Sequence, residues 1–252
     1  MTLLVDIGNT RVKWASTDSR GALTPQRAAA YSDWTIDDWQ RELFGSVRCD
    51  RVLASTVAGS RTRESVVAAA ARNGVDDVRF VASTAHAAGV RNAYPNPALL
   101  GVDRWVAVIG AWHLKHGPCC IADIGTATTL DSLDATGRHL GGFIVPGPAL
   151  MVRSLHGSTS DLANHSAASQ SNERGRLADN TRDAIERGCR VALAALVDRM
   201  FTDLAEELHT EPVLLLTGGA VADVRPYLRS EAEHVPDLVL HGLARLALEP
   251  GP

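Results

Sequence analysis

Apolar and polar positions change their spacing several times along the chain, and these changes predict a mixed α/β protein. Residues 2–5 are apolar, a corner containing glycine follows, and residues 11–15 alternate, which predicts a strand, a tight turn and a second strand. Residues 51–57 and 78–82 are further runs of strand length, whereas 61–72 has the spacing of a helix. The first part of the chain therefore alternates strands with helices.

A helix predicted over 102–115 is stopped by Gly117-Pro118, and the opening pattern then returns. Predicted strands at 119–122, 128–133 and 139–145 form this return. The later expectations are a short helix after Gly147, a mostly irregular segment over 156–180, a long helix over 181–208, a strand over 213–216, a glycine turn opening a helix, and a last strand over 235–240. Because both halves begin with strand, corner and strand, we expect two lobes, 1–117 and 118–252.

Composition and charge exclude several classes of protein. The 252 residues carry a formal net charge of −4, and no basic cluster indicates a nucleic-acid partner. We see no basic leader segment and no long apolar stretch, so we expect neither a signal peptide nor a membrane partner. The four cysteines form no C-x-x-C pair, which favours a reduced cytoplasmic protein and argues against a zinc site.

Two acidic corners carry the main chemical signal. Asp6-Ile7-Gly8-Asn9-Thr10 and Asp123-Ile124-Gly125-Thr126-Ala127 each follow an apolar run directly. A carboxylate at a strand end can face a hydrated cation, and a glycine beside it lets backbone N–H groups approach phosphate oxygens. One such corner is ordinary turn chemistry, but two in the same register predict a duplicated fold that binds a nucleotide from both sides.

A third element lies downstream, at Thr217-Gly218-Gly219-Ala220. A buried strand that runs through two glycines into a helix exposes backbone N–H groups, where a base or ribose could approach closely. The ordinary alternative is a tight connection without a ligand. No G-x-x-x-x-G-K-[ST] loop occurs, and a strand follows the first glycine corner where a Rossmann domain has a helix.

Seven ordered blocks carry a resemblance over nearly the whole chain. They are Asp6-x-Gly8-Asn9-Thr10-x-x-Lys13, Tyr94-x-x-Pro97-x-x-x-Gly101-x-Asp103-Arg104, Asp123-x-Gly125-Thr126-Ala127-x-Thr129, Gly141-Gly142-x-Ile144-x-Pro146-Gly147, Asn180-Thr181-x-x-Ala184-Ile185-x-x-Gly188, Thr217-Gly218-Gly219 and Asp237-Leu238-Val239-Leu240-x-Gly242-Leu243. The chain resembles the type III pantothenate kinases, within the superfamily of acetate and sugar kinases, Hsp70 and actin. The resemblance implies a duplicated actin-like (ribonuclease H-like) two-lobe kinase fold.

The resemblance also implies roles for individual residues. It assigns Asp103 as the carboxylate that takes the proton of the acceptor hydroxyl. It places a monovalent cation, K⁺ or NH₄⁺, at Asp123, and Asp6 is then the better candidate to face Mg²⁺ through water. The residues implied for ATP are Asp6, Ile7, Gly8, Asn9, Thr10, Arg11, Val12, Lys13 and Thr126, and those implied for the acceptor are Tyr94, Gly101, Val102, Asp103, Arg104 and Thr181.

Five of these residues also have an ordinary structural interpretation. Asp103 could be a plain acid at a helix start, and Arg104 could form a surface ion pair. Tyr94 could pack on the surface, and Lys13 could be a solvated residue at a sheet edge. Thr181 follows Asn180, and such a pair most often caps a helix. The sequence alone leaves these alternatives open.

The main hypothesis is an enzyme that uses ATP to phosphorylate pantothenate, the first step towards coenzyme A, as a cytoplasmic homodimer; both the activity and the dimer are implied by the resemblance. A kinase for another small molecule and a non-catalytic accessory or regulatory relative are the alternatives. Residues 156–168 lack the proline-containing stretch expected in the family, which leaves the shape of that loop open.

Overall fold

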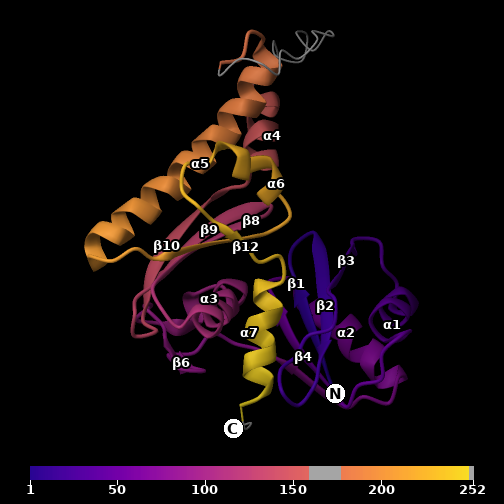
Figure 1. The fold of residues 1–252 in the computed structure, drawn as a ribbon. Helices are drawn as coiled ribbons and strands as arrows, with labels where there is room; N and C mark the ends of the chain where they lie inside the picture. Colours follow the sequence, from indigo (N-terminus) through magenta and orange to yellow (C-terminus); the bar gives the residue numbers. More distant parts are fainter. Residues whose placement is uncertain (159–176, 250–252) are drawn as a thin grey trace. The chain divides into compact units, whose positions relative to one another are not determined.

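The structure is a computed structural model that describes residues 1–158 and 177–249 (Figure 1). The chain forms two compact units. The first comprises Met1–Cys119, Asp131–Gly141 and Asp237–Pro252, and the second comprises Cys120–Leu130 and Gly142–Pro236. The lobes predicted from sequence, 1–117 and 118–252, stay a prediction; in the compact units, residues 131–141 and the C-terminal segment group with the N-terminal part of the chain.

The first sheet contains five strands in the order β3-β2-β1-β4-β5. Their bounds are Thr2–Ile7 (β1), Arg11–Thr17 (β2), Arg27–Ala30 (β3), Arg51–Thr56 (β4) and Asp77–Phe80 (β5). Strand β1 is central, antiparallel to β2 and parallel to β4. The predicted opening of strand, corner and strand is therefore confirmed.

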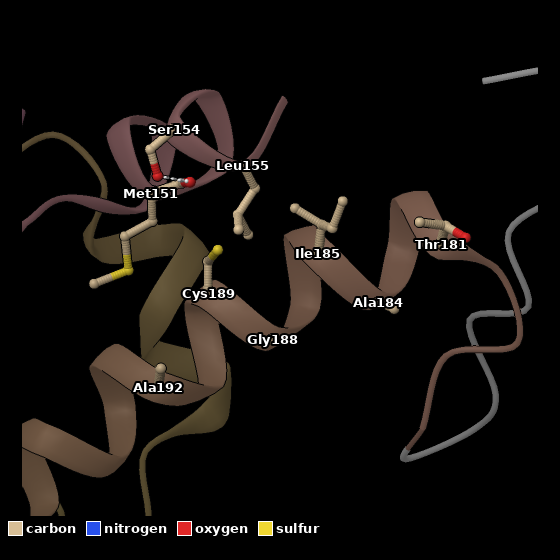
Figure 2. Close-up of a pocket in the computed structure, with 9 residues that line it drawn as sticks. All are labelled: Met151, Ser154, Leu155, Thr181, Ala184, Ile185, Gly188, Cys189 and Ala192. Atoms are coloured by element: carbon tan, nitrogen blue, oxygen red, sulfur yellow. Dashed lines mark hydrogen bonds between the residues drawn. The ribbon is translucent and has the colours of Figure 1, made fainter. Parts of the chain in front are cut away.

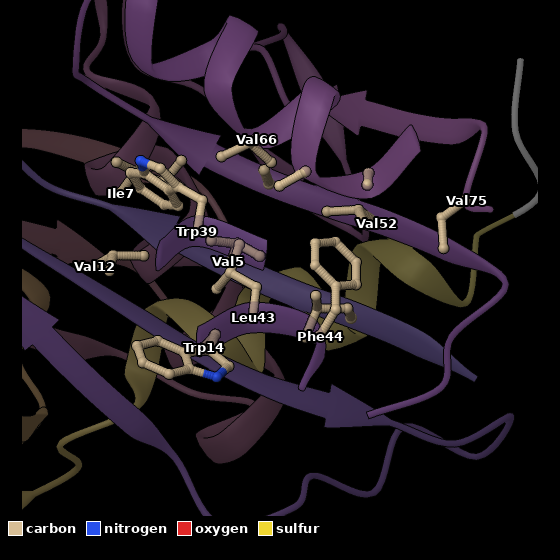
Figure 3. Close-up of a cluster of buried hydrophobic side chains, with 14 residues drawn as sticks. Val5, Ile7, Val12, Trp14, Trp39, Leu43, Phe44, Val52, Val66 and Val75 are labelled. Atoms are coloured by element: carbon tan, nitrogen blue, oxygen red, sulfur yellow. The ribbon is translucent and has the colours of Figure 1, made fainter. Parts of the chain in front are cut away.

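Helices α1 (Ile36–Phe44) and α2 (Ser60–Arg72) pack on one face of this sheet. Alternate side chains of β1 meet apolar side chains of both helices in a buried cluster (Figure 3). The aromatic members from α1 are Trp39 and Phe44, and Trp39 is only 2% exposed. The amphipathic spacing of α1 is visible in the sequence, but the depth at which its apolar side is buried depends on this packing.

Helix α3 (Val102–Lys115) contacts β4, and helix α7 (Leu238–Ala247) contacts β1 and β4, both from the other side of the sheet (Figure 1). The two helices cross with almost no space between their backbones. A Cβ built on Gly242 would lie 2.0 Å from the carbonyl oxygen of Val106, and one built on Gly110 would lie 2.4 Å from that of Leu238. Glycine at both positions allows this contact, which holds α3 and α7 together.

The glycine at the helix crossing gives a stability prediction. Gly242→Ala should lower the free energy of unfolding by about 1–3 kcal/mol, because the new methyl group overlaps a backbone oxygen that cannot rotate away. The control is Gly59→Ala at the start of α2, where a Cβ meets nothing within 4 Å. We expect a loss of only about 0.5 kcal/mol there. Chemical denaturation measures both variants, and equal losses would contradict the argument.

The second sheet repeats the first, with strand order β10-β9-β8-β11-β12. Its strands are Cys119–Ile124 (β8), Ala127–Leu133 (β9), His139–Pro146 (β10), Val213–Thr217 (β11) and Glu233–His234 (β12). In each sheet the first strand in chain order is central, the next two follow on one side, and the last two lie on the other side. The same strand order twice in one chain is what a duplicated α/β fold requires.

The helices of the second unit are α4 (Pro148–Ser158), α5 (Thr181–Leu208) and α6 (Val221–Val224). The long helix has the predicted bounds. Of the segment predicted to be irregular, 156–158 belongs to α4 and 177–180 precedes α5, while 159–176 lies outside the described residues. The short remaining elements are His86–Ala87 (β6), Val90–Arg91 (β7), Pro97–Leu99 (η1) and Arg225–Tyr227 (η3). Within 1–158 and 177–249, no helix combines the length and apolar character that crossing a membrane requires.

The strand predicted over 235–240 is wrong. The last strand is Glu233–His234, and the helix α7 begins at Leu238. A short run such as Leu238-Val239-Leu240 fits a buried strand and a buried helix equally well, because apolar residues on all sides remove the periodicity that separates the two. Packing against α3 at Gly242 decides in favour of the helix.

Candidate active site

The first acidic corner is a tight turn between β1 and β2. The backbone N–H of Gly8 donates to the carbonyl oxygen of Arg11 at 3.0 Å. Asp6 and Lys13 are register partners, so their side chains share one face of the sheet, opposite to the apolar cluster of Figure 3. This is the face that α3 and α7 cover. The corner therefore directs a carboxylate and an ammonium group towards the side on which the helix carrying Asp103 lies.

The remaining residues of this corner divide into buried and exposed positions. The side chains of Ile7 and Val12 are fully buried, so only their backbone atoms can reach a ligand. Asn9, Thr10 and Arg11 are exposed. Two of the nine positions that the resemblance implies for ATP therefore have side chains that pack in the hydrophobic core.

Tyr31 supports the same corner and was not identified from the sequence. Its hydroxyl group donates to the carbonyl oxygen of Gly8 at 2.6 Å, and its ring lies 5.3 Å from that of Trp39. Burial raises the pKa of Tyr31, so the hydroxyl keeps its proton for this bond. A tyrosine more than twenty positions from a turn gives no sequence signal for such a contact.

The second acidic corner connects β8 and β9 and is braced from two directions. Its own closing bond runs from the N–H of Gly125 to the carbonyl oxygen of Ala127 at 3.0 Å. The N–H of Gly147 donates to the carbonyl oxygen of Thr126 at 3.0 Å, and the N–H of Ala220 donates to the carbonyl oxygen of Ile124 at 2.9 Å. The predicted glycine turn at 217–220 therefore packs directly on the corner that carries Asp123.

Gly218 makes this packing possible. Its φ of +98° is a conformation that L side chains rarely adopt. A Cβ at this position would lie 2.5 Å from Oδ1 of Asp123 and 2.4 Å from the carbonyl oxygen of Ile124. The absence of a side chain at Gly218 therefore allows the turn to lie against the Asp123 carboxylate.

Asp103 lies in the first turn of α3, where the predicted helix begins. Its Oδ1 accepts the backbone N–H of Arg104 at 2.8 Å. Gly101 precedes the helix, and a Cβ there would lie 2.8 Å from the same Oδ1. Burial raises the pKa of Asp103, and the N–H and the charge of Arg104 oppose that effect. A partly desolvated carboxylate with a raised pKa is suited to accept a proton.

Arg104 is buried and not at the surface, which overturns its ordinary interpretation as half of a surface ion pair. Its Nε donates to Asp131 Oδ2 at 2.9 Å and its Nη2 to Asp131 Oδ1 at 2.7 Å. Its Nη1 donates to the hydroxyl of Tyr94 at 3.1 Å. Two residues predicted to contact the acceptor, Tyr94 and Arg104, are thus brought together in the first unit.

Asp131 and His139 complete this group and were missed from the sequence. Nε2 of His139 is 2.7 Å from Oδ1 of Asp131, and the His139 ring stacks on that of Tyr94 with 6.3 Å between centroids. The exposed fraction is 3% for Asp131 and 0% for His139. The available signal was an aspartate inside the predicted strand 128–133, since a carboxylate in a buried strand requires a partner.

Thr181 is the first residue of α5, next to Asn180. The Asn180 side chain accepts the N–H of Asp183 at 2.9 Å, so the capping role predicted for this pair is present. Thr181 also lines an open apolar groove of about 570 Å³ between α4 and α5 (Figure 2). In Figure 2, Met151 and Leu155 of α4 face Ile185 and Cys189 of α5.

The predicted site residues are divided between the two units. The first unit contains the first corner, Tyr94 and the sequence from Gly101 to Arg104, whereas the second contains Asp123, Thr126 and Thr181. Within the described part of the chain, no three side chains of His, Cys, Asp and Glu gather as a ready metal cluster. A cation at either corner would therefore depend on one carboxylate together with water or a phosphate ligand.

Comparison with known proteins decides the family. The family model described as type III pantothenate kinase matches residues 2–203. A type III pantothenate kinase of Azoarcus sp. (strain BH72) is 40% identical over 248 residues, which are 98% of this chain and 90% of the relative. One of Nitrosococcus oceani is 37% identical over 257 residues, with 98% and 94% covered. The chain belongs to the type III pantothenate kinase family.

This membership confirms the predicted enzyme class, a phosphotransferase, and implies ATP and a divalent metal. Solved structures of distant proteins share the fold. A proposed Baf family transcriptional activator of Campylobacter jejuni is 20% identical, with a TM-score of 0.59 and 97% and 96% of the two chains covered. Component A of (R)-2-hydroxyglutaryl-CoA dehydratase of Acidaminococcus fermentans is 16% identical, with a TM-score of 0.57, and 98% and 96% are covered. The predicted duplicated actin-like fold is confirmed.

Proposed function

We propose that the protein transfers the γ-phosphoryl group of ATP to the primary hydroxyl group of pantothenate, which gives 4′-phosphopantothenate, the first step of coenzyme A synthesis. The observation that carries the proposal is the start of α3 in a chain of this family. There a partly buried Asp103 carboxylate with a raised pKa adjoins an arginine held by Tyr94 and Asp131. A kinase needs a carboxylate aimed at the acceptor and a fixed polar group that orients the acceptor.

Asp103 is the general base of this proposal. Its carboxylate takes the proton of the hydroxyl group as the hydroxyl oxygen forms a bond to the γ-phosphorus. The bond from that phosphorus to the β–γ bridging oxygen breaks, and ADP leaves with the electron pair. The N–H of Arg104 holds one carboxylate oxygen, at 2.8 Å, which leaves the other oxygen to accept the proton.

Both acidic corners bind the phosphates of ATP in this proposal. The positions from Asp6 to Lys13 and Thr126 contribute backbone N–H groups, hydroxyl groups and the Lys13 ammonium. Asp6 fits Mg²⁺ held through water, because its carboxylate stands at a strand end in register with Lys13. Asp123 fits K⁺ or NH₄⁺, because its carboxylate stands at the end of β8 at the second corner and a Cβ at position 218 would lie 2.5 Å from its Oδ1. When bound, these cations neutralise negative charge on the phosphates.

The acceptor contacts in this proposal are Tyr94, Gly101, Val102, Arg104 and Thr181. We also propose that the protein is a homodimer and that Thr181 acts at its interface. Large apolar side chains of the second unit are exposed on β10, α4 and α5: Phe143 (55%), Ile144 (62%), Leu150 (38%), Leu155 (43%) and Val191 (45%). Exposed apolar side chains of this kind, of which Leu155 also lines the groove of Figure 2, are typical of a surface covered by a second copy.

We place the protein in the cytoplasm. None of the four cysteines, which all lie in the described part of the chain, forms a disulfide, and Cys119, Cys120 and Cys189 are buried. Buried cysteines without disulfides are typical of proteins kept under reducing conditions. Formation of an intramolecular disulfide in the protein purified without reductant would argue against this placement.

A coupled assay of ADP release tests the proposed activity. Pantothenate should support ADP release with ATP, whereas glycerol, acetate and hexoses should not. Replacing K⁺ or NH₄⁺ with Na⁺ should lower the rate if Asp123 holds the monovalent cation. Equal activity with another acceptor would favour a different small-molecule kinase, and the absence of both ADP release and pantothenate binding would favour a non-catalytic relative.

A further inference from the structure

Arg104 is held more rigidly than an exposed arginine would be. A guanidinium group has five N–H donors. Two of them bond to Asp131 and one to Tyr94, so two remain for a substrate. The two parallel hydrogen bonds to the Asp131 carboxylate fix the plane of the guanidinium group, and the Tyr94 hydroxyl group fixes the position of Nη1. The direction of the two remaining donors is therefore set before any substrate arrives.

Asp131 is itself held in place. Its Oδ1 meets both Arg104 Nη2 and His139 Nε2, each at 2.7 Å. The His139 ring stacks on Tyr94 with 13° between the ring planes, and Tyr94 returns to Arg104. The four side chains form a closed ring of contacts, and all of them belong to the first unit.

A buried ion pair of this kind needs a reason beyond stability. Removing two charges from water costs about as much as their attraction returns, and apolar side chains of the same volume are often equally stable there. Asp131 is too deeply buried to serve as a surface contact. Nδ1 of His139 also has no hydrogen-bond partner within the described part of the chain, which adds a further cost. These costs are understandable if the network orients Arg104.

We propose that Asp131 is a positioning residue for the acceptor substrate: it holds Arg104 in the orientation that binds pantothenate, and His139 holds Asp131. The inference rests on the proposed function. Asp131 acts only through Arg104 and touches neither ATP nor pantothenate. Its loss should therefore weaken binding of the acceptor and leave binding of ATP unchanged.

The central test is a cycle of Asp131→Asn, Arg104→Gln and the double variant, with KM measured separately for pantothenate and ATP. Asp131→Asn keeps the shape of the side chain but disrupts the pair of hydrogen bonds to Arg104. We expect the KM for pantothenate to rise about tenfold. The KM for ATP should stay within about twofold. In the Arg104→Gln background, Asp131→Asn should have almost no further effect on the KM for pantothenate, because the residue through which it acts is gone.

The matched control is Asp134→Asn in the same hairpin. Asp134 accepts the N–H groups of Thr136 and Arg138 and shapes the turn without contacting Arg104. This variant should lower the melting temperature but keep the wild-type KM for pantothenate. If Asp131→Asn instead raises both KM values alike, or raises the KM for pantothenate equally in the Arg104→Gln background, its role is structural and the proposal is overturned.

If Asp131→Asn fails to fold, His139→Phe tests the proposal in its place. This variant keeps a ring on Tyr94 but removes the hydrogen bond to Asp131. A selective rise of about threefold in the KM for pantothenate supports the proposal, and an unchanged KM overturns it. Wild-type protein without pantothenate-dependent ADP release overturns the proposed function and this inference together. An active wild type with an Asp131→Asn variant of normal KM overturns the inference alone.

Discussion

Asp103→Asn is expected to lower kcat by about 10²–10⁴-fold without lowering the melting temperature at neutral pH. The amide keeps the shape of the side chain and can still accept the N–H of Arg104, so the start of α3 should stay folded. It cannot take a proton from the acceptor hydroxyl. A drop in kcat smaller than tenfold would rule out Asp103 as the general base.

The effect of this substitution on stability has a definite sign. Because burial raises the pKa of Asp103 above its ordinary value of 3.8, the folded protein holds a proton that the unfolded chain has already lost. Between the two pKa values, stability therefore falls as pH rises, and above both of them the ionised carboxylate remains a cost. The asparagine variant lacks this cost. Thermal unfolding measured from acid to neutral pH should show a wild-type melting temperature below that of the variant at neutral pH, and the difference should shrink as pH falls.

The contrasting control is Asp38→Asn in the first turn of α1. Hydrogen bonds from Thr35 lower the pKa of Asp38 to about 2, so this carboxylate stabilises the fold above its unfolded pKa and loses that contribution as pH falls. Asp38→Asn should lower the melting temperature at neutral pH and leave kcat unchanged. Both acids lie in the first turn of a helix. Opposite effects of the two substitutions on the melting temperature at neutral pH would distinguish a catalytic base from a capping group.

The raised pKa of Asp103 also predicts how activity falls at acid pH. Asp103 must be ionised to accept a proton, so kcat/KM for pantothenate should fall as pH drops through the raised pKa of this carboxyl group. The midpoint should lie above 3.8, the ordinary value for aspartate. A midpoint at or below that value, in the pH range where the protein stays folded, would place the base elsewhere.

Gly218→Ala should produce the second large effect, a loss of about 2–4 kcal/mol in the free energy of unfolding. The substitution forces an L side chain into φ +98° and places its Cβ against Ile124 and the Asp123 carboxylate. If Asp123 holds the monovalent cation, the variant should also need a higher K⁺ concentration for half-maximal activity.

The adjacent glycine is the matched control for this prediction. A Cβ built on Gly219 meets nothing within 4 Å, so Gly219→Ala should change stability by less than about 1 kcal/mol. Denaturation curves and K⁺ titrations of both variants measure the two effects. A Gly218→Ala variant as stable as the Gly219→Ala variant would contradict the packing argument, and an unchanged K⁺ requirement would separate Asp123 from the cation.

Local patterns determined much of this protein. The helix over 102–115 starts after a glycine and stops at Gly117-Pro118, and the helix over 181–208 starts at an asparagine whose side chain caps it. Such signals act within a few residues, so one sequence contains them in full. The repeated acidic corner likewise predicted the duplication that the two strand orders show.

Other features depended on contacts between distant parts of the chain. The apolar run at 238–240 forms a helix because Gly242 meets Val106 of α3. The partner of Arg104 is Asp131, 27 positions away, and the carbonyl oxygen of Gly8 is bonded by Tyr31, 23 positions away. The sequence by itself determined the family, the strand–corner–strand units and the candidate base Asp103. Only the tertiary structure decided how Arg104 is held and what surrounds Asp123, because partners of buried polar groups are chosen by folding and carry no fixed spacing along a chain.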